Sequence, residues 1–488
     1  MIINVNPKNK FSTSSVFFLN SDFKLNMSSD IDIPDELFNI IDSKIRDIIR
    51  YPKVTSFNTN LKDFDSFFTA VLGVDISDDL DIFRELAGDI FLHLSNQKNK
   101  SLNVYLPILK NRTNEEVIKT FLEGFLLADY RYDKFLKVDV LKIENLNLFV
   151  KSDDKFGDTI NKTVALVDSI KYCRDLINTP PSHLNPTSYL EEIKILANEN
   201  QLSLKIISGK ELYEQGMECL YSVSTGSIHK SSLLILENKP TKPSNKKPIC
   251  LIGKGVTFDS GGINIKRSDE ILEKMKYDMA GSAVVASTVL ALKKMNVNKH
   301  IIAVLGLAEN MVGANAYKPG DILKAYNGKT VEIINTDAEG RLALADALSY
   351  VCKNYDPEFI FDIATLTGAA VTALGYDIVP ILGNNLAFVK SISDFSYEVG
   401  EKCWPLPLDK IYLKYIKGDI SDLKNVHEGM NAGVITAAIF LNEFVDSKVK
   451  WVHFDIAGKE FIKKGKSYQP KGATASLVRL FTEFILQY

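Results

Sequence analysis

The stretch "VEIINTDAEGRLALADALSYVCKN" (331–354) predicts a strand arm, a charged loop and a helix in direct succession. Its first residues alternate as in a strand, and its second half carries apolar residues at helical spacing. The loop between them holds Asp337, Glu339 and Arg341, each two residues apart. Asn, Asp and Gly favour turns, so a solvated turn is one interpretation of this loop. If the loop is extended instead, its three charged side chains point the same way.

Short apolar runs and helical segments alternate on either side of this stretch. Four runs are predicted to be buried strands and two segments to be helices. The strands are at 248–253, 301–308, 359–364 and 451–457, and the helices are at 280–295 and 341–354. We expect a hairpin just before the charged loop, with Asn327 and Gly328 as its two-residue turn. The alternation predicts an α/β domain with a largely parallel or mixed sheet.

The residues that precede this domain differ from it in composition. Residues 1–155 are rich in Asn, Asp, Ser, Lys, Ile and Phe and mix strand-like with helix-like patches, so they predict a separate α/β accessory domain. An amphipathic segment follows, and we expect a linking helix at 156–175. The remaining residues, 176–488, then form the larger domain.

Composition argues against several classes of function. The 488 residues carry a formal net charge of -3, so no overall charge favours nucleic acid or an anionic membrane. No run of about 18 apolar residues predicts a membrane span, and the first residues lack the pattern of a secretion signal. The five cysteines are scattered without metal-like spacing, which indicates reduced thiols and a cytoplasmic location.

Three loops at the ends of predicted elements carry unusual polar groups. The groups are Lys254, Asp259 and Lys266 in "GKGVTFDSGGINIK", Asp278 in "MKYDMAG", and Asp337, Glu339 and Arg341 in "NTDAEGR". Sites in α/β sheets form at the carboxyl ends of strands, so we expect these loops to converge. Their carboxylates would repel one another unless cations neutralised them. Hard divalent metals do this, and two ions can share bridging carboxylates.

Lys254 lies between two glycines, which by itself suggests a solvated loop charge. The residues around it lack the GxxxxGK[ST] spacing of a phosphate-binding loop. A lysine buried beside two cations would lose its proton, because burial and positive neighbours both lower its pKa. It could then bind a metal as a neutral amine. No His lies near these loops, so a zinc ion here would be held by oxygen ligands and such an amine.

The chain resembles the leucyl aminopeptidases, the cytosol-type exopeptidases with two metal ions. The motifs that carry the resemblance, in order and spacing, are "GKGVTFDSGGINIK", "MKYDMAG", "NTDAEGRLALADAL" and "DIATLTGA" (362–369). The resemblance covers about residues 170–488. It implies an N-terminal α/β domain, a linking helix and a larger C-terminal catalytic domain with a central mixed sheet flanked by helices. It also implies a homohexamer, built as a dimer of trimers, that acts on peptides.

The same resemblance implies two divalent ions per subunit, Mn²⁺ or Zn²⁺, and a ligand set for each. The ligands of the tighter ion would be Lys254, Asp259, Asp278 and Glu339. The ligands of the more exchangeable ion would be Asp259, Asp337 and Glu339. A water between the ions would have its pKa lowered and would become the nucleophile.

Other residues receive roles in catalysis and substrate binding from the resemblance. Lys266 would stabilise the oxyanion, and Arg341 would hold a bicarbonate that relays a proton. The substrate-side pocket would be formed by Met275, Thr365, Leu366 and Gly368. The apolar side chain of Met275 favours Leu- or Met-like first residues.

Two other classes of function fit parts of the pattern. One is a DNA-binding or regulatory protein of the same fold, although the mild negative charge speaks against it. The other is a two-metal phosphatase, which Lys254 as a ligand does not favour. The chain also departs from the family's pattern at Ala280 and Gly281, where the family has Gly-Gly, and in "GATA" (472–475), where it has "GATG".

Overall fold

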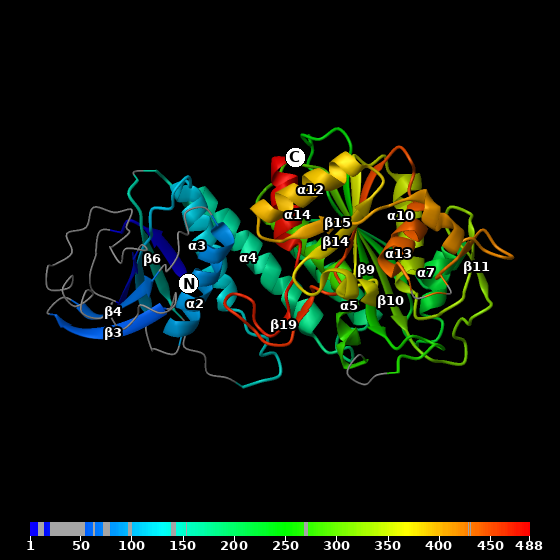
Figure 1. Cartoon of the computed structure of the whole chain (residues 1–488), viewed down its shortest axis with the longest axis horizontal. Helices are drawn as coiled ribbons and strands as arrows, with labels where there is room; N and C mark the ends of the chain where they lie inside the picture. Colours follow the sequence, from blue (N-terminus) through cyan, green and yellow to red (C-terminus); the bar gives the residue numbers. More distant parts are fainter. Residues whose placement is uncertain are drawn as a thin grey trace. The chain divides into compact units, whose positions relative to one another are not determined.

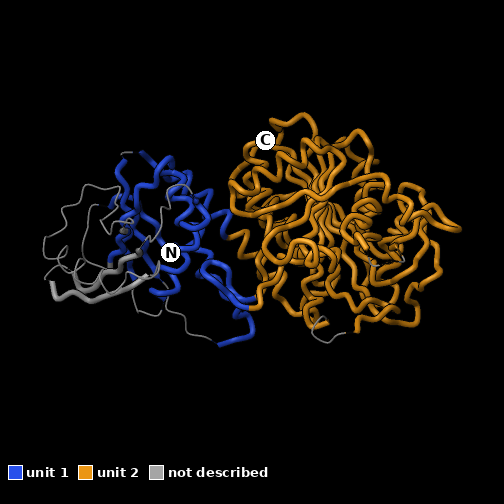
Figure 2. The backbone as a smooth tube through the Cα atoms, viewed as in Figure 1, with its two compact units in different colours: residues 1–167, 464–471 blue, residues 168–463, 472–488 orange. Residues whose placement is uncertain are grey.

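A computed structural model describes most of the chain. The described residues are 1–7, 14–19, 54–61, 64–71, 79–95, 100–137, 143–152, 154–267, 272–427, 429 and 431–488. Parts of the predicted accessory domain therefore lie outside the described residues. The chain divides into two compact units (Figure 2), unit 1 with residues 1–167 and 464–471 and unit 2 with residues 168–463 and 472–488. The division falls inside α4 (Gly157–Asn178), the helix at the predicted linker.

The described part of unit 1 contains a six-stranded sheet, the start of α4, and the helices α2 (Leu80–Leu94) and α3 (Asn114–Ala128), which pack on each other (Figure 1). The strands, in spatial order, are β1 (Ile2–Val5), β6 (Asn145–Phe149), β5 (Ser101–Tyr105), β2 (Ser14–Leu19), β4 (Phe64–Val71) and β3 (Val54–Leu61). β3 and β4 pair antiparallel, whereas the other neighbours pair parallel. Thr113 and Glu116 form a capping box that begins α3. Unit 1 is thus an α/β domain.

Unit 2 contains a mixed sheet, as predicted, and this sheet has eight strands. Its strands, in spatial order, are β15 (Cys403–Pro405), β14 (Val379–Gly383), β17 (Lys450–Asp455), β13 (Phe359–Ala364), β9 (Ile249–Asp259), β10 (Ile301–Asn310), β8 (Ser232–Asn238) and β7 (Ser203–Ser208). The four central strands, from β17 to β10, run parallel. The antiparallel pairs are β14 with β17, β8 with β10, and β7 with β8. The predicted strands all lie among the central four.

Helices flank this sheet. They are α5 (Pro186–Glu199), α6 (Lys210–Glu214), α7 (Glu218–Val223), α9 (Ala280–Lys294), α10 (Gly340–Asn354), α11 (Gly368–Leu374), α12 (Leu386–Glu398), α13 (Gly433–Asn442) and α14 (Val478–Gln487), with the 3₁₀ helices η1 (Glu273–Tyr277) and η2 (Lys410–Tyr415). α9 packs on β9, β10 and β13, and α14 packs on α9. α10, α7 and α13 contribute apolar side chains to one core together with Cys250 and Ile252 of β9. Successive residues of β9 face opposite sides of the sheet. Gly253 therefore faces the other side, where α9 packs closely, since a Cβ on Gly253 would lie 2.4 Å from Ser282 Cα.

The order of the strands explains where a site can form. From β9 the chain crosses to β10 on one side, and it later adds β13 on the other side of β9. Such a reversal leaves a crevice at the carboxyl ends of the parallel strands, where ligands bind in open α/β sheets. Asp259, Asn310, Ala364 and Asp455 end the four central strands.

Two small sheets complete unit 2. One joins β11 (Ile322–Lys324), β12 (Thr330–Glu332) and β16 (Leu423–Lys424), and the other joins β18 (Phe461–Ile462) and β19 (Gly472–Ala473). β11 and β12 pair antiparallel, which confirms the predicted hairpin.

The turn of this hairpin differs from the prediction. Gly328 N donates to Ala325 O at 2.8 Å, so Tyr326 and Asn327 are the central residues of the turn. Gly328 follows them with a φ of 94°. The loop is thus a three-residue turn that needs glycine at its last position, and the predicted two-residue turn at Asn327 and Gly328 is wrong.

The chain departs from the family's glycines at Ala280 and Ala475, and the structure tolerates the first change better than the second. A Cβ on Gly281 would lie 2.0 Å from Ile363 O, so this glycine allows α9 to approach β13, and the chain keeps it. Ala280, one residue earlier, is fully buried and is accommodated. Ala475 has a φ of 58°, a left-handed conformation that costs a residue with a Cβ roughly 1–2 kcal/mol. The second departure therefore carries backbone strain that glycine would relieve.

Candidate metal centre

Three segments of unit 2 bring the predicted metal ligands together. β9 supplies Lys254 and Asp259, the residue after η1 is Asp278, and the loop before α10 supplies Asp337 and Glu339. Apart from Asp337, these ligands are buried, with exposed fractions of 3% for Lys254, 2% for Asp259, 6% for Asp278 and 1% for Glu339. Burial on this scale is rare for charged groups unless they are paired or bind metal.

The loop from 335 to 339 reaches the cluster by a turn and not as an extended segment. Asn335 Oδ1 accepts from Asp337 N at 2.8 Å, and Asn335 O accepts from Ala338 N at 3.3 Å. Glu339 has helical backbone angles, φ -76° and ψ -35°, and α10 begins at the next residue. The expectation of an extended loop with side chains at intervals of two is therefore wrong. Asp337 and Glu339 converge because a side-chain-stabilised turn leads directly into a helix.

Carboxylate oxygens of Asp259, Asp337 and Glu339 lie within 4.8 Å of one another. Lys254 links Asp278 to this group, because its Nζ lies 2.7 Å from Asp278 Oδ1 and 2.9 Å from Glu339 Oε1. The structure therefore brings all five predicted ligands into one cluster.

Lys266 and Lys254 approach the cluster from different places. Lys266 follows β9 on a loop, and its Nζ lies 2.6 Å from Asp259 Oδ2 and also pairs with Asp337. Its side chain is 14% exposed, whereas that of Lys254 is 3% exposed. Lys254 lies over the start of α10, since a Cβ on Gly340 would be 2.6 Å from Lys254 Cε. Lys254 is thus a buried neighbour of the cluster, and Lys266 is at its accessible side.

Burial and crowding shift the pKa values of the cluster. Burial raises the pKa of Asp278, and burial together with the charge of Asp259 raises the pKa of Asp337 to about 7. Burial alone would lower the pKa of Lys254, but the charges of Asp278, Glu339 and Asp259 outweigh it and raise that pKa. The protein atoms alone thus hold Lys254 as an ammonium. Only neighbouring cations would turn it into the neutral amine that the sequence predicts.

The donor atoms of the cluster fit divalent cations. Among the described residues, the buried Asp278 Oδ2 and Glu339 Oε2 accept no hydrogen bond. A buried carboxylate oxygen without a donor is costly, and a hard cation such as Mn²⁺ would satisfy it. The set of carboxylate oxygens and one amine is also a chemically suitable ligand set for Mn²⁺ or Zn²⁺.

Sequence reasoning missed two residues that support the cluster. Asn310 Nδ2 donates to Asp259 Oδ1 at 2.8 Å and to Thr336 O at 3.0 Å. Thr336 Oγ1 in turn donates to Gly261 O at 2.6 Å. Asn310 follows a predicted strand by two residues, so its place at the carboxyl end of that strand was a usable signal.

Arg341 lies in the first turn of α10 and is 5% exposed. Among the described residues, its Nε and Nη1 are buried and have no hydrogen-bond partner. Burial lowers the pKa of Arg341 to about 10, although the charges of Glu339 and Asp455 oppose this shift. A buried guanidinium with free donors at a helix N-terminus is suited to bind an anion.

The predicted pocket residues occupy two segments near the ligands. Thr365 contacts two predicted ligands, because its Oγ1 donates to Asp278 Oδ1 at 2.7 Å and its carbonyl accepts from Lys254 Nζ at 3.0 Å. Leu366 packs half-buried against the core of unit 2, and Gly368 begins α11. Met275 is half-buried in η1, three residues before Asp278.

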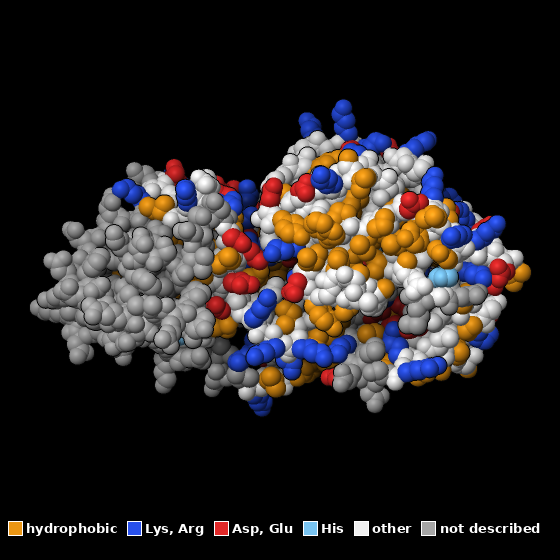
Figure 3. All heavy atoms as spheres, viewed as in Figure 1, with side chains coloured by type: hydrophobic (Ala, Val, Ile, Leu, Met, Phe, Trp, Pro, Cys, Tyr) orange, Lys and Arg blue, Asp and Glu red, His pale blue; other side chains and the backbone are white. Residues whose placement is uncertain are grey.

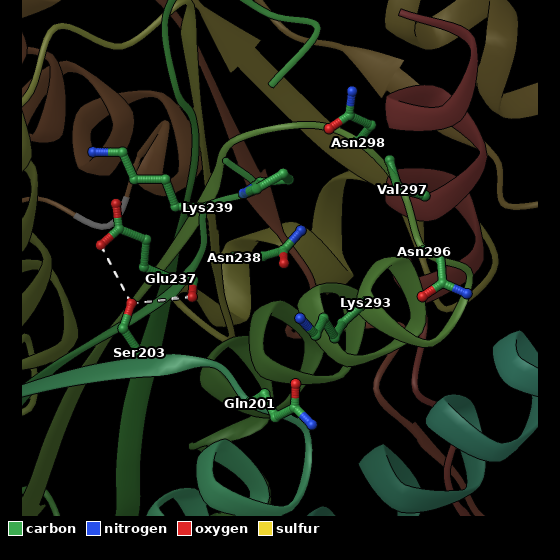
Figure 4. A pocket seen from close by; sticks show the side chains of 10 residues that line it. Gln201, Ser203, Glu237, Asn238, Lys239, Lys293, Asn296, Val297 and Asn298 are labelled. Atoms are coloured by element: carbon green, nitrogen blue, oxygen red, sulfur yellow. Dashed lines mark hydrogen bonds between the residues drawn. The ribbon is translucent and has the colours of Figure 1, made fainter. Parts of the chain in front are cut away.

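A surface pocket of about 380 Å³ lies elsewhere in unit 2 (Figure 4). Its lining is mostly polar and includes Gln201, Asn238 and Lys293. Asn238 pairs with Ile301 at the start of β10, whereas the carboxylates lie beyond the ends of β9 and β10. The pocket contains none of the predicted site residues, so it is separate from the metal centre.

Four carboxylates and two lysines at the carboxyl edge of an α/β sheet are the kind of site that metal-dependent enzymes use. Comparison with known proteins agrees with this class. The model of the catalytic domain of the cytosol aminopeptidase family matches residues 171–482, and that of the family's N-terminal domain matches residues 56–138. The chain belongs to the cytosol aminopeptidase family.

Individual relatives match along most of their length. A probable cytosol aminopeptidase of Roseiflexus castenholzii is 38% identical over 84% of this chain and 85% of its own. One from Sulfurihydrogenibium sp. is 34% identical over 100% of this chain and 98% of its own. Among solved structures, the bottromycin maturation enzyme BotP in complex with Mn superposes with a TM-score of 0.85 and 26% identity, covering 97% of this chain and 98% of that chain.

Family membership makes the chain a metal-dependent aminopeptidase, a hydrolase that depends on divalent metal ions. The relatives carry peptidase names, and they lend no support to the DNA-binding alternative. In the part of the chain that the structure describes, no helix has the length and apolar character to cross a membrane.

Proposed function

We propose that the protein releases N-terminal amino acids, preferably Leu-like ones, from peptides at a site with two divalent ions. The observation that carries the proposal is the convergence of Asp259, Asp337 and Glu339 within 4.8 Å, with Lys254 and Asp278 joined to them. A peptide's free amino terminus is a metal ligand that an internal peptide bond lacks. This difference would restrict cleavage to the first residue.

The ligands divide into two overlapping sets in this proposal. One set holds the tighter ion with Lys254, Asp259, Asp278 and Glu339, and the other holds the exchangeable ion with Asp259, Asp337 and Glu339. The unpartnered oxygens of Asp278 and Glu339 support this division. When bound, two ions of this kind supply the charge that makes a water nucleophilic and polarises a carbonyl group. The structurally similar enzyme BotP was solved in complex with Mn, which favours Mn²⁺ over Zn²⁺ as the first ion to test.

Lys266 acts on the oxyanion in this proposal. Its ammonium is held at the accessible side of the cluster by Asp259 and Asp337, and these charges outweigh the burial that would lower its pKa. The pKa of Lys266 is therefore raised, and the group stays cationic. A fixed cation beside the scissile carbonyl stabilises the negative charge that develops on its oxygen.

Arg341 would hold a bicarbonate that takes the proton of the attacking water. Its free Nε and Nη1 and the exposed N–H groups at the start of α10 support an anion at this place. The group of Asp259, Asp337 and Glu339 contains no His, so the proposal assigns the role of base to a bound anion.

The first side chain of the substrate would lie against Met275, Thr365, Leu366 and Gly368. Met275 and Leu366 are half-buried apolar side chains near Asp278 and Thr365, which favours a Leu-like residue over a charged one. The relatives' names place them in the cytosol, and we propose the same compartment and intracellular peptide turnover for this chain.

A homohexamer, built as a dimer of trimers, is part of the proposal. Unit 2 exposes large apolar side chains, among them Leu386, Trp404, Ile411 and Ile420. Figure 3 shows apolar side chains gathered on one face of this unit. Exposed apolar patches mark interaction surfaces, so light scattering should find six times the 54.5 kDa of one chain. A monomer at micromolar concentration would contradict the assembly.

The test is hydrolysis of Leu-p-nitroanilide and a panel of other aminoacyl anilides by protein loaded with Mn²⁺, Zn²⁺ or Co²⁺. We expect Leu to be among the best substrates and activity to require metal. The Glu339→Ala variant should lose bound metal and activity together, since Glu339 belongs to both ligand sets. A metal-loaded protein that hydrolyses none of the anilides, or a fully active Glu339→Ala variant, would contradict the proposal.

A further inference from the structure

The loop at 365–367, directly after β13, lies against two of the predicted metal ligands. Thr365 Oγ1 donates to Asp278 Oδ1 at 2.7 Å, and the carbonyl of Thr365 accepts from Lys254 Nζ at 3.0 Å. Lys254 and Asp278 are the two ligands that only the tighter ion uses in the proposed function. The position of this loop therefore bears on one of the two ions and not on the other.

Asp455 holds the same loop from its opposite side. This residue ends β17, pairs in register with Ala364 at the end of β13, and is 1% exposed. Its Oδ1 accepts from Leu366 N at 3.1 Å and from Thr367 N at 3.3 Å, and its Oδ2 accepts from Thr367 Oγ1 at 2.6 Å. The three hydrogen bonds that this buried carboxylate accepts fix both the backbone and a side chain of the loop.

A purely local role does not account for these contacts. A carboxylate at a strand end commonly satisfies the next turn of its own chain, and Asp455 does this with Ala457 N at 3.3 Å. The bonds to Leu366 and Thr367 instead join two segments that are almost ninety residues apart in the chain. They tie the loop after β13 to the end of β17.

We propose that Asp455 is a positioning residue of the metal centre, which sets the affinity of the tighter ion through the loop at 365–367. The inference rests on the proposed function for the assignment of Lys254 and Asp278 to that ion. Partners of metal ligands that lie one contact away commonly change metal affinity by about 10- to 100-fold when they are removed. Asp455 acts one step further out, through Thr365.

The test measures Mn²⁺ binding by competition with a chromophoric chelator, for the full chain and for the Asp455→Ala variant. We expect two ions to bind to the wild type. In the variant, the dissociation constant of one ion should rise about 10-fold or more, while that of the other changes less than about 2-fold. An equal effect on both ions, or no effect, would overturn the proposal.

A matched control is the Asp362→Asn variant. Asp362 is another fully buried Asp of the same sheet, but its carboxylate accepts from Trp451 Nε1 and contacts His453 Nδ1, each at 2.6 Å. These contacts do not touch the loop. We expect this variant to lose stability and to keep both dissociation constants, so a selective loss of one ion in it would show that any damage to the core has this effect.

Two further variants separate the hydrogen bonds from the charge and from folding. The Asp455→Asn variant keeps Oδ1 for the backbone donors and removes the negative charge, so we expect affinities within about 3-fold of the wild type. Thr367→Val removes the bond to Oδ2 and should weaken the same ion, whereas Thr367→Ser should restore it. If Asp455→Asn behaves like Asp455→Ala, or if Thr367→Val has no effect, the hydrogen bonds are not the cause.

The binding measurement needs no substrate, which separates this inference from the proposed function. Selective loss of one ion in a protein that hydrolyses no aminoacyl anilide would support the role of Asp455 and overturn the proposed function. Normal hydrolysis together with unchanged metal binding in the Asp455→Ala variant would support the proposed function and overturn the role of Asp455.

Discussion

Lys254 and Lys266 pair with different carboxylates of one cluster, and their surroundings suit them to different tasks. Lys254 lies within β9, is 3% exposed, and lies over Gly340 where α10 begins. Lys266 lies on a loop, its side chain is 14% exposed, and it pairs with Asp259 and Asp337. A ligand must be enclosed by its ion's other ligands, whereas a group that stabilises an oxyanion must face the substrate. Burial alone thus distinguishes the two lysines.

This difference leads to a prediction for the Lys266→Ala variant. Removal of Lys266 takes a cation away from Asp259 and Asp337 and leaves all five predicted ligands in place, so we expect two bound ions. The loss of the fixed charge should lower kcat by about 10²- to 10³-fold with a smaller change in KM. Metal analysis and steady-state kinetics on Leu-p-nitroanilide measure both effects. Lys266→Arg is the matched control and should recover part of kcat, while loss of metal in Lys266→Ala would contradict the assigned role.

At the scale of elements, the N-terminus of α9 depends on one glycine. A Cβ on Gly281 would lie 2.0 Å from Ile363 O and 3.0 Å from Lys254 N, both of which are backbone atoms that side-chain rotation cannot relieve. The Gly281→Ala variant must therefore move α9 away from β13 and β9. Because Asp278 precedes α9 and Lys254 lies in β9, the same movement would separate two predicted ligands.

We expect Gly281→Ala to lower the free energy of unfolding by about 1–3 kcal/mol or more, as overpacking in a core does, and to weaken metal binding as well. Ala280→Gly is the matched control at the neighbouring position and should cost about 1 kcal/mol through helix propensity, with metal binding unchanged. Urea unfolding and metal analysis of both variants provide the test. A Gly281→Ala variant as stable as the wild type would show that α9 can shift freely.

The same elements show how far sequence reasoning reaches. Apolar periodicity predicts the central strands, α9 and α10. Charge at strand ends and a resemblance in ordered motifs predict the five candidate ligands, which the structure brings together. Asn310 and Asp455 were missed because a single polar residue at a strand end is common, and their partners on other segments lie 26 to 89 positions away along the chain. The route of the 335–339 loop was wrong because Asn335 bonds to its own backbone, a local choice that alternating charge does not reveal.

At the scale of the whole molecule, Asp346 makes stability depend on pH. This residue of α10 is fully buried, and its two oxygens accept from Leu220 N and Tyr326 N at 2.8 Å each, so it joins α10 to α7 and to the β11–β12 hairpin. Burial raises the pKa of Asp346 to about 7, although the backbone donors oppose the shift. The folded state therefore keeps a proton that the unfolded state loses between about pH 4 and pH 7. In this window stability falls as the pH rises, and the loss is complete above the folded pKa.

The Asp346→Asn variant cannot ionise and should lack this contribution. It loses one of the two accepted hydrogen bonds, so we expect it to be less stable than the wild type at about pH 4 by roughly 1–3 kcal/mol. The difference in the free energy of unfolding between the two proteins should narrow, or change sign, as the pH rises to about 7. Urea unfolding of both proteins across this range, with a chelator present throughout, measures the difference. A constant gap from pH 4 to pH 8 would contradict the assigned pKa.

Metal binding should stabilise unit 2 as a whole, because its ligands come from β9, from the segment before α9 and from the loop before α10. Lys254 and Lys266 already pair with the four carboxylates, so we expect the metal-free protein to remain folded. Ions that bind only the folded state add stability by mass action, about 2.7 kcal/mol per site at a free concentration 100 times the dissociation constant. Calorimetry should therefore find that a chelator lowers Tm and that added Mn²⁺ restores it in proportion to the logarithm of its concentration. The Tm of the Glu339→Ala variant, which lacks a ligand of both sets, should change little with either treatment. A wild-type Tm that changes with neither chelator nor Mn²⁺ would mean that the cluster is not a metal centre.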